Sequence, residues 1–304
     1  MSERITRGDR IVDANVHLWD QVHNAVSWLS DRTLLRDMLG NYDALPDRYT
    51  LTDYRRDTAP LPVEGVVWSD PGCADPEAAI RAVEEQDDGQ TLVGIVTLGG
   101  PRAPGFGDFV ARVAADHFVT SVRVRLVAGL SDERAGTGSG TDPAWRDALA
   151  RLADANLVAT IEASADHLPL VTELVRGVDG LRVVIDHFGW PTDLGTDGRR
   201  RHLAELARLA AAGDVATRVD AIGTLFGDWD TETLRPWLEG VVEVFGADRT
   251  MLGSDFPIET LRSTFAELYG AYDEILAGCS ADERRDLFAG TATRWYGAVG
   301  ASGP

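Results

Sequence analysis

The chain alternates short runs of β-branched residues with amphipathic segments from one end to the other. A short apolar run bounded by turn residues is typical of a buried strand, and apolar residues three or four positions apart are typical of a helix with one buried face. Repeated units of this kind indicate a parallel sheet covered by helices. The pattern predicts strands at 11–17, 65–69, 91–98, 121–126, 158–162, 182–186, 216–221 and 250–253.

The segments between these strands predict helices at 76–88, 108–116, 143–156, 168–177, 199–212, 231–245 and 261–277. A final helix at 281–296 is expected to pack outside the sheet. Eight strands of this type favour a (β/α)8 TIM barrel of the α/β class over a doubly wound sheet. No repeat beyond the strand-helix period divides the chain, so we expect one domain over residues 1–304.

Two connections are long and follow strands, on the face where barrel active sites lie. The second, 127–142, is rich in glycine and serine, which predicts mobility. The first, 18–62, is rich in aromatic residues. It forms either a lid and pocket wall or a hydrophobic cap on the barrel, and both interpretations remain open. Its aromatic residues include Trp19, Trp28, Tyr42, Tyr49 and Tyr54.

The charge balance limits the partners of the protein. A net charge of -20 argues against nucleic acid and anionic membranes, because repulsion opposes both encounters. A small-molecule substrate is the expected partner, and a homo-oligomer remains open. No apolar stretch approaches the roughly 20 residues of a membrane-spanning helix, and the first residues lack the apolar core of a signal peptide, so the cytoplasm is the expected compartment. Cys73 and Cys279 match no metal or redox spacing and are expected to be unpaired.

All 29 basic residues are arginines, since the chain contains no lysine. This absence excludes a Schiff-base lysine and a phosphate-binding P-loop lysine. It also excludes a carbamylated lysine that bridges two metal ions.

The first strand carries the sequence IVDANVHLWD, which places Asn15 and His17 two residues apart. Side chains at this spacing in a strand point to the same face, so both are expected to project into one pocket. A metal-dependent barrel hydrolase carries a His-x-His pair here. This chain has the geometry of a two-ligand site with one ligand replaced by an amide.

Two other strand ends carry candidate catalytic groups. Asp255 follows the last strand, where a carboxylate in a partly dry pocket can act as a general base; the alternative is a helix N-cap. His187 ends the run VVIDH and is a candidate catalytic group or ligand, although a lone histidine in such a turn is often structural. Asp186 precedes His187 and is expected to point the other way, toward the helices.

The fourth and fifth strands supply candidate substrate-binding groups. Arg123 and Arg125 share one strand face and would present two guanidinium groups to a carboxylate or another oxyanion. The alternative is that they pair with Glu162 or Asp220 inside the barrel mouth. Glu162 and, after His187, Trp190 are further candidates for substrate contact, together with the loop tryptophans Trp19 and Trp28.

Four segments resemble one known family. The runs IVDANVHLWD, VVIDHFGWP and MLGSDFPIE resemble the first, sixth and eighth strand motifs of the amidohydrolase superfamily, in the branch called amidohydrolase 2, and LFAGTATRWY is similar to its closing helix. The resemblance covers essentially the whole chain. That branch includes sugar lactonases, pyrone dicarboxylate hydrolase and zinc-dependent decarboxylases.

The resemblance implies roles for individual residues. His17 matches the second histidine of the His-x-His motif, His187 the histidine of strand six and Asp255 the aspartate of strand eight. Asn15 departs from the pattern, as does Thr291, where the closing helix usually has asparagine. A zinc site normally needs three or more ligands from Cys, His and carboxylate, so the departure at Asn15 weakens the case for metal.

The resemblance therefore favours a hydrolase without a metal or other cofactor that opens a small, anionic lactone or cyclic ester. Asp255 would activate water, and His17, His187 and the arginines would polarise the carbonyl, with Asn15 donating a hydrogen bond to the substrate or oxyanion. The alternative cofactor is one weakly held Zn2+ on His17, His187 and Asp255. Alternative functions are a decarboxylase, dehydratase or cyclase of secondary metabolism, and an inactive barrel that binds a ligand.

Overall fold

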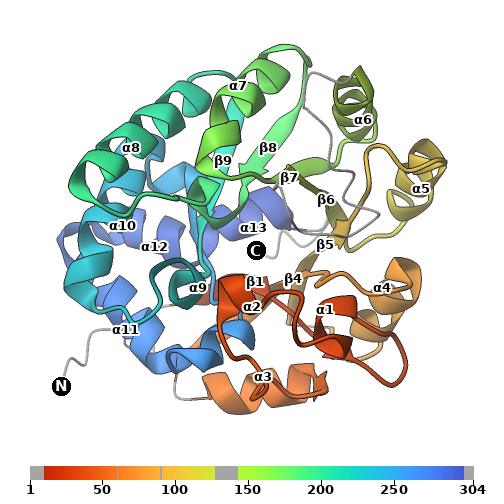
Figure 1. Cartoon of the computed structure of the whole chain (residues 1–304), viewed down its shortest axis with the longest axis horizontal. Coiled ribbons are helices and arrows are strands. Elements are labelled where there is room, and N and C mark those ends of the chain that lie inside the picture. The colour runs from red at the N-terminus through yellow and green to blue at the C-terminus, as the bar shows by residue number, and fades with distance from the viewer. Residues whose placement is uncertain (1–9, 60, 90, 127–142, 298–304) are drawn as a thin grey trace.

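The computed structural model describes residues 10–59, 61–89, 91–126 and 143–297 (Figure 1). Eight parallel strands form one sheet in the order β1, β4, β5, β6, β7, β8, β9, β10, so strands adjacent in the barrel are also consecutive in the chain. Each predicted strand is present, and its ends lie within two residues of the prediction. The strands are β1 (Ile11–Val16), β4 (Val63–Ser69), β5 (Leu92–Leu98), β6 (Val119–Arg125), β7 (Val158–Glu162), β8 (Arg182–Ile185), β9 (Asp214–Val219) and β10 (Thr250–Leu252).

The barrel closes where the first and last strands meet. Val16 and Phe256 form a parallel bridge, and the His17 N–H donates to the Phe256 carbonyl at 2.7 Å. The Asp255 N–H donates to the Asn15 carbonyl at 2.9 Å. This seam therefore brings residues about 240 positions apart into register at the carboxyl end of the barrel.

An outer ring of helices covers the strands (Figure 1). Several of these helices begin at side chains that accept a hydrogen bond from the first turn, such as Asp75 before α4 and Asp230 before α10. Buried aliphatic and aromatic residues fill the layer between helices and strands. The principal helices are α4 (Pro76–Glu84), α5 (Phe106–Val113), α6 (Pro143–Asp154), α7 (Leu168–Arg176), α8 (Thr196–Ala210), α10 (Thr231–Phe245) and α11 (Phe265–Ile275).

The long connection after β1 folds into short elements over the barrel mouth. A two-stranded antiparallel ribbon pairs β2 (Trp19–Asp20) with β3 (Arg48–Tyr49). The helices α1 (Ser27–Ser30), α2 (Arg36–Leu39) and α3 (Leu51–Thr58) complete the segment. The other long connection, 127–142, lies outside the described residues.

The chain ends with α12 (Ala281–Arg285), a π-helical turn (Asp286–Gly290) and α13 (Thr291–Tyr296). The expectation that this final segment packs outside is wrong, because α13 lies against the amino end of the barrel interior (Figure 1). The Tyr296 hydroxyl shares a hydrogen bond with the Thr160 hydroxyl at 2.9 Å, and the Tyr296 ring is fully buried. The strand residues in this cluster include the small Ala14 and Ala216, which leave room for the aromatic ring.

Within the described residues, neither Cys73 nor Cys279 forms a disulfide. Within the described residues, no helix is both long and apolar enough to cross a membrane.

Candidate active site

A pocket opens at the carboxyl end of the barrel and encloses about 560 Å³ of empty space, including its mouth. Its floor is polar and its wall is largely apolar. Six polar residues of the floor are His17, Arg123, Arg125, Glu162, His187 and Asp255. The other lining residues are Trp28, Leu35, Met38, Leu39, Pro71, Trp190, Ala221, Thr224 and Ile258.

Asp255 lies at the end of the last strand, with 3% of its surface exposed. Its carboxylate accepts a hydrogen bond from the Asn15 amide at 3.2 Å and lies 3.1 Å from His17 Nε2. The alternative role of helix N-cap is excluded, because the following 3-10 helix begins at Ile258 and receives no side-chain cap. Asp255 is therefore a carboxylate held at the pocket floor.

His17 is oriented by a backbone carbonyl. Its Nδ1 lies 2.7 Å from the Ser69 carbonyl oxygen, which can only accept, so Nδ1 carries a hydrogen. Nε2 then faces Asp255 Oδ1 at 3.1 Å. The two side chains therefore lie within hydrogen-bonding distance of each other at the pocket floor.

Asn15 is fully buried and does not line the pocket. Its amide N–H donates to Asp255, and its Oδ1 has no hydrogen-bond partner in the described part of the chain. Asn15 and His17 do converge, but they converge on Asp255. The structure therefore places Asn15 behind the carboxylate, where it orients Asp255.

His187 sits in a left-handed turn after β8. The backbone φ angles of His187, Phe188, Gly189 and Trp190 are 49°, 38°, 79° and 46°. Consecutive left-handed residues other than glycine are strained, so this turn is held by its surroundings. One such contact comes from His202 on α8, whose Nε2 lies 2.8 Å from the Phe188 carbonyl oxygen.

His187 is an imidazolium at neutral pH. Its Nδ1 donates to Asp220 Oδ1 at 2.7 Å. Burial alone would lower the pKa of His187, but the carboxylates of Asp220 and Asp186 outweigh it and raise this pKa to about 9. Burial would raise the pKa of Asp220, but His187 and Arg218 lower it to about 2. Because Nδ1 is engaged, Nε2 is the nitrogen that can donate to a ligand in the pocket.

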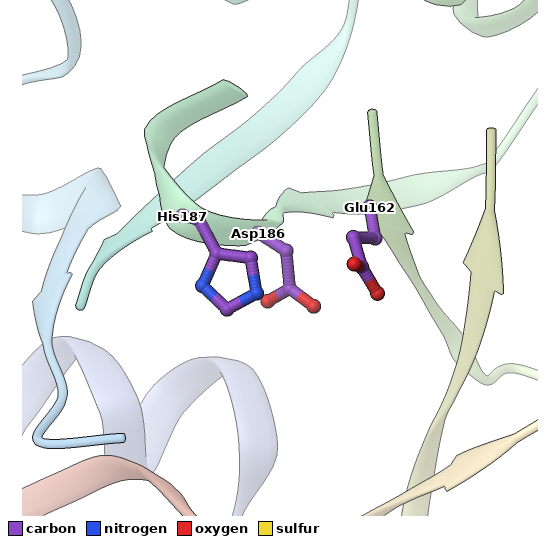
Figure 2. Close-up of side chains that lie close together, drawn as sticks. All are labelled: Glu162, Asp186 and His187. Carbon is purple, nitrogen blue, oxygen red and sulfur yellow. The ribbon is translucent and has the colours of Figure 1, made fainter. Parts of the chain in front are cut away.

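Asp186 points into the barrel, so the expectation that it faces the helices is wrong. Its fully buried carboxylate pairs with Arg218 and lies 3.7 Å from Arg123. Strand β8 ends at Ile185, and the alternation of side chains ends with it. Figure 2 shows Asp186 beside His187, with Glu162 of β7 on its other side.

Arg123 and Arg125 line the pocket and also pair internally. Arg125 Nε donates to Glu162 at 2.7 Å, which is one of the pairings anticipated for these arginines. Arg123 donates to the Asp70 carbonyl and is fully buried, and burial lowers its pKa. Burial would raise the pKa of Glu162, but Arg125 and Arg123 lower it to about 2. The guanidinium charges are thus largely balanced before any ligand binds.

Two of the three candidate tryptophans line the pocket. Trp190 packs edge-on against His187, with ring centroids 4.9 Å apart. Trp28 contributes its ring to the wall, and its Nε1 donates to the Pro71 carbonyl at 2.9 Å. Trp19 does not line the pocket; it packs edge-on against Trp28, with ring centroids 5.7 Å apart.

Sequence reasoning missed part of the pocket. Arg218 was not among the predicted site residues, although it links Asp186, Asp220 and the Ser69 hydroxyl. The apolar residues Leu35, Met38 and Leu39 were not singled out either. Their spacing of three and four positions was the available signal, because it places them on one face of a helical turn.

The donor set of this site fits a divalent cation poorly. Among the described residues, one group of three potential ligands has its atoms within 4.8 Å of one another, namely Glu162, Asp186 and His187. Arg125 pairs with the first carboxylate and Arg218 with the second, so a cation there would be repelled by guanidinium groups. The ligand set considered from the sequence, His17, His187 and Asp255, does not form such a group.

Known proteins resemble this chain in sequence. A family model described as amidohydrolase matches residues 12–298. An L-fucono-1,5-lactonase of Burkholderia ambifaria is 28% identical over 214 residues, covering 67% of this chain and 69% of that protein. The range matched by the family model includes every residue of the pocket floor.

Solved structures share the fold. An amidohydrolase of Burkholderia multivorans with bound HEPES has a TM-score of 0.78 at 21% identity, covering 94% of this chain and 98% of that one. The same protein binds zinc in another crystal form. A putative 2-pyrone-4,6-dicarboxylic acid hydrolase of Pseudomonas putida has a TM-score of 0.72 at 23% identity, covering 94% and 97% of the two chains.

Proposed function

Because this chain belongs to the amidohydrolase family and is an enzyme of the hydrolase type, we propose that it opens a small lactone or cyclic ester with water activated by Asp255. One observation carries the proposal. A buried carboxylate and a buried imidazolium, Asp255 and His187, line the same pocket. A base and a hydrogen-bond donor at one pocket are the two groups that acyl transfer to water requires.

In the proposed reaction, Asp255 removes a proton from water while the water oxygen bonds to the carbonyl carbon. His187 Nε2–H donates to the developing oxyanion, and Arg125 adds positive charge beside it. The intermediate collapses by breaking the ring C–O bond. The proton held by Asp255 passes to the leaving oxygen, so one lactone and one water give one hydroxy acid.

We propose that this reaction proceeds without a metal ion. The support is the donor set: Asn15 stands where a ligand would be, and both carboxylates of the Glu162, Asp186 and His187 group pair with arginine. The internal pairing of Arg123 and Arg125 also extends the proposal to neutral lactones, because these arginines do not require a substrate anion for charge balance.

The test is Asp255→Asn in the purified protein, assayed on a panel of lactones. We expect kcat/KM to fall by about 100-fold or more, because the amide cannot accept the proton from water. The matched control is Asp228→Asn, an exposed aspartate outside the pocket lining, which should leave kcat/KM unchanged. An unaffected Asp255→Asn variant, or no turnover of any lactone by the parent protein, would overturn the proposal.

An isotope measurement distinguishes hydrolysis from the alternative reactions, and a metal measurement distinguishes a metal-free enzyme from a zinc enzyme. Hydrolysis in H2(18)O places one heavy oxygen in the product carboxylate, whereas a decarboxylase, dehydratase or cyclase on the same scaffold would not. Elemental analysis of protein purified without added metal, with activity assayed after chelation, tests the metal-free proposal. One equivalent of zinc whose removal abolishes activity would contradict it.

A further inference from the structure

The pocket has an apolar wall, which we define as Trp28, Leu35, Met38, Leu39, Pro71 and Ile258. Four of these six residues come from the long connection after β1, and the wall faces a floor of charged groups. Leu35 precedes α2, and Met38 and Leu39 lie on it, so their spacing turns all three toward the pocket. The two intervening residues, Arg36 and Asp37, are exposed.

The wall offers few hydrogen-bonding groups to a ligand. The indole N–H of Trp28 already donates to the Pro71 carbonyl at 2.9 Å. The Trp28 carbonyl accepts from the Tyr42 hydroxyl at 2.9 Å, and the Leu35 N–H donates to that hydroxyl at 3.3 Å. Among the described lining residues outside the floor and the wall, Thr224 carries a hydroxyl and Trp190 an indole N–H.

A wall with few hydrogen-bonding groups is expected to bind hydroxylated lactones and apolar lactones with different affinities. A sugar lactone carries hydroxyl groups on most ring carbons, and a hydroxyl buried against the wall would lose its water without gaining a partner. Each unmatched hydroxyl weakens binding by about tenfold. An alkyl or aromatic group placed there instead gains from leaving water.

We propose that the substrate is an alkyl- or aryl-substituted lactone, whose carbonyl meets the floor and whose apolar group lies on the wall. The inference rests on the proposed function, because it assigns the carbonyl to the floor residues. The expected preference for apolar ligands does not depend on the proposed hydrolysis, because the wall contacts the ligand whichever reaction the floor residues catalyse.

The first experiment compares three δ-lactones on the intact protein. Dihydrocoumarin has a fused aromatic ring, δ-decalactone has an alkyl chain, and D-glucono-1,5-lactone has hydroxyl groups. We expect kcat/KM for the first two to exceed that for the sugar lactone by about 100-fold. Preference for the sugar lactone would overturn the inference and leave the proposed hydrolysis intact.

Variants locate the preference in the wall. Met38→Gln, alone and combined with Leu35→Asn, should lower kcat/KM for the apolar lactones by about 10-fold or more, mainly by raising KM. Both side chains are partly exposed, so we expect the variants to fold, and a thermal melt of each variant checks this. The matched control is Leu34→Asn, because Leu34 is 45% exposed and lies outside the lining. Equal effects of the Leu34 and Met38 variants would contradict the assignment.

A binding measurement keeps the inference testable if no lactone is hydrolysed. Calorimetry with 3-(2-hydroxyphenyl)propanoate and with gluconate compares an aromatic and a polyhydroxylated acid of similar charge. We expect the aromatic acid to bind at least about tenfold more tightly, and Met38→Gln to reduce that difference. Equal or tighter binding of gluconate would overturn the inference, whereas failure of the lactone panel alone would overturn only the proposed function.

Discussion

The pocket floor has two halves, each built around one histidine, and they differ in what holds the imidazole. In the seam half, His17 Nδ1 donates to the Ser69 backbone carbonyl. In the opposite half, His187 Nδ1 donates to the Asp220 carboxylate. A carbonyl fixes the tautomer without adding charge, whereas a carboxylate also stabilises the imidazolium. Histidine therefore has two roles in this pocket. His17 is the partner of the proposed base Asp255, and His187 is a positively charged hydrogen-bond donor.

The two halves also differ in how their charges are balanced. In the seam half, Asp255 faces one histidine and one amide. In the opposite half, carboxylates alternate with arginines, so Arg218 contacts both Asp186 and Asp220. Buried charges are tolerated only in such pairs, and removing one member leaves its partner uncompensated. The opposite half is therefore expected to be less tolerant of substitution.

The largest effect after loss of Asp255 is expected from Asp220→Asn. Removing this carboxylate takes away the main cause of the raised pKa of His187, so the imidazole becomes neutral at a lower pH. We expect kcat/KM at pH 8 to fall by about 100-fold, as for loss of an oxyanion donor. In the parent protein, activity should decline as pH rises through about 9, and in the variant this decline should begin at lower pH. Profiles of kcat/KM against pH for the two proteins measure the loss at pH 8 and the pH at which activity declines. Coincident profiles would refute the pairing of His187 with Asp220.

The same pair predicts how stability depends on pH. Because folding raises the pKa of His187 to about 9, its contribution to the free energy of unfolding is fully present below its ordinary pKa of 6.5. That contribution is lost as pH rises through about 9. The difference in unfolding free energy between the parent and Asp220→Asn, measured in urea, should therefore shrink between pH 6.5 and 9.5. A difference independent of pH would argue against a charged His187.

A smaller effect is expected from changing the seam half with Asn15→His. The new imidazole would join His17 and Asp255 as a third potential ligand, and we expect this variant to retain zinc that the parent does not. Metal-free activity should fall about 10-fold, because Asp255 loses its amide donor. Zinc content by mass spectrometry and the thermal shift with added zinc measure the change. Asn15→Ala is the control, since it removes the amide without adding a ligand.

The smallest effect is expected from His202→Phe, which acts on His187 through its turn. Phenylalanine keeps an aromatic ring at position 202. The Phe188 carbonyl, however, loses the hydrogen bond that His202 Nε2 donates to it at 2.8 Å. We expect a loss of about 1 kcal/mol in the free energy of unfolding and a drop of a few-fold in kcat, with KM little changed. His202→Gln should restore part of kcat, and His117→Phe, at an exposed position, should have no effect. Equal kcat in the Phe and Gln variants would exclude a positioning role.

The sequence predicted the strands well because each is a local apolar run bounded by turn residues. It failed where the backbone departs from a regular element. Asp186 was assigned to the outside because alternation was assumed to continue, whereas the strand ends at Ile185 and a left-handed turn begins at His187. That turn depends on contacts such as the one from His202 to the Phe188 carbonyl, 14 positions apart in the chain, and no local pattern encodes such a contact.

Site chemistry was predictable to a similar degree. Strand-end position identified His17, His187 and Asp255, and all three line the pocket. It did not identify Arg218, whose importance lies in its partners on other strands. Trp19 and Trp28 were equivalent in the sequence, and only the packing of one against the other decides which ring reaches the pocket.

The position of α13 has a consequence for biosynthesis. The amino end of the barrel interior is completed by Ala292, Trp295 and Tyr296, which belong to α13 and are therefore translated after all eight strands. The earlier strands can pair as they emerge, but their inward residues stay uncovered until this helix leaves the ribosome. Cotranslational folding should therefore stop at an incomplete barrel. A nascent chain stalled before residue 291 should remain sensitive to protease until α13 is added.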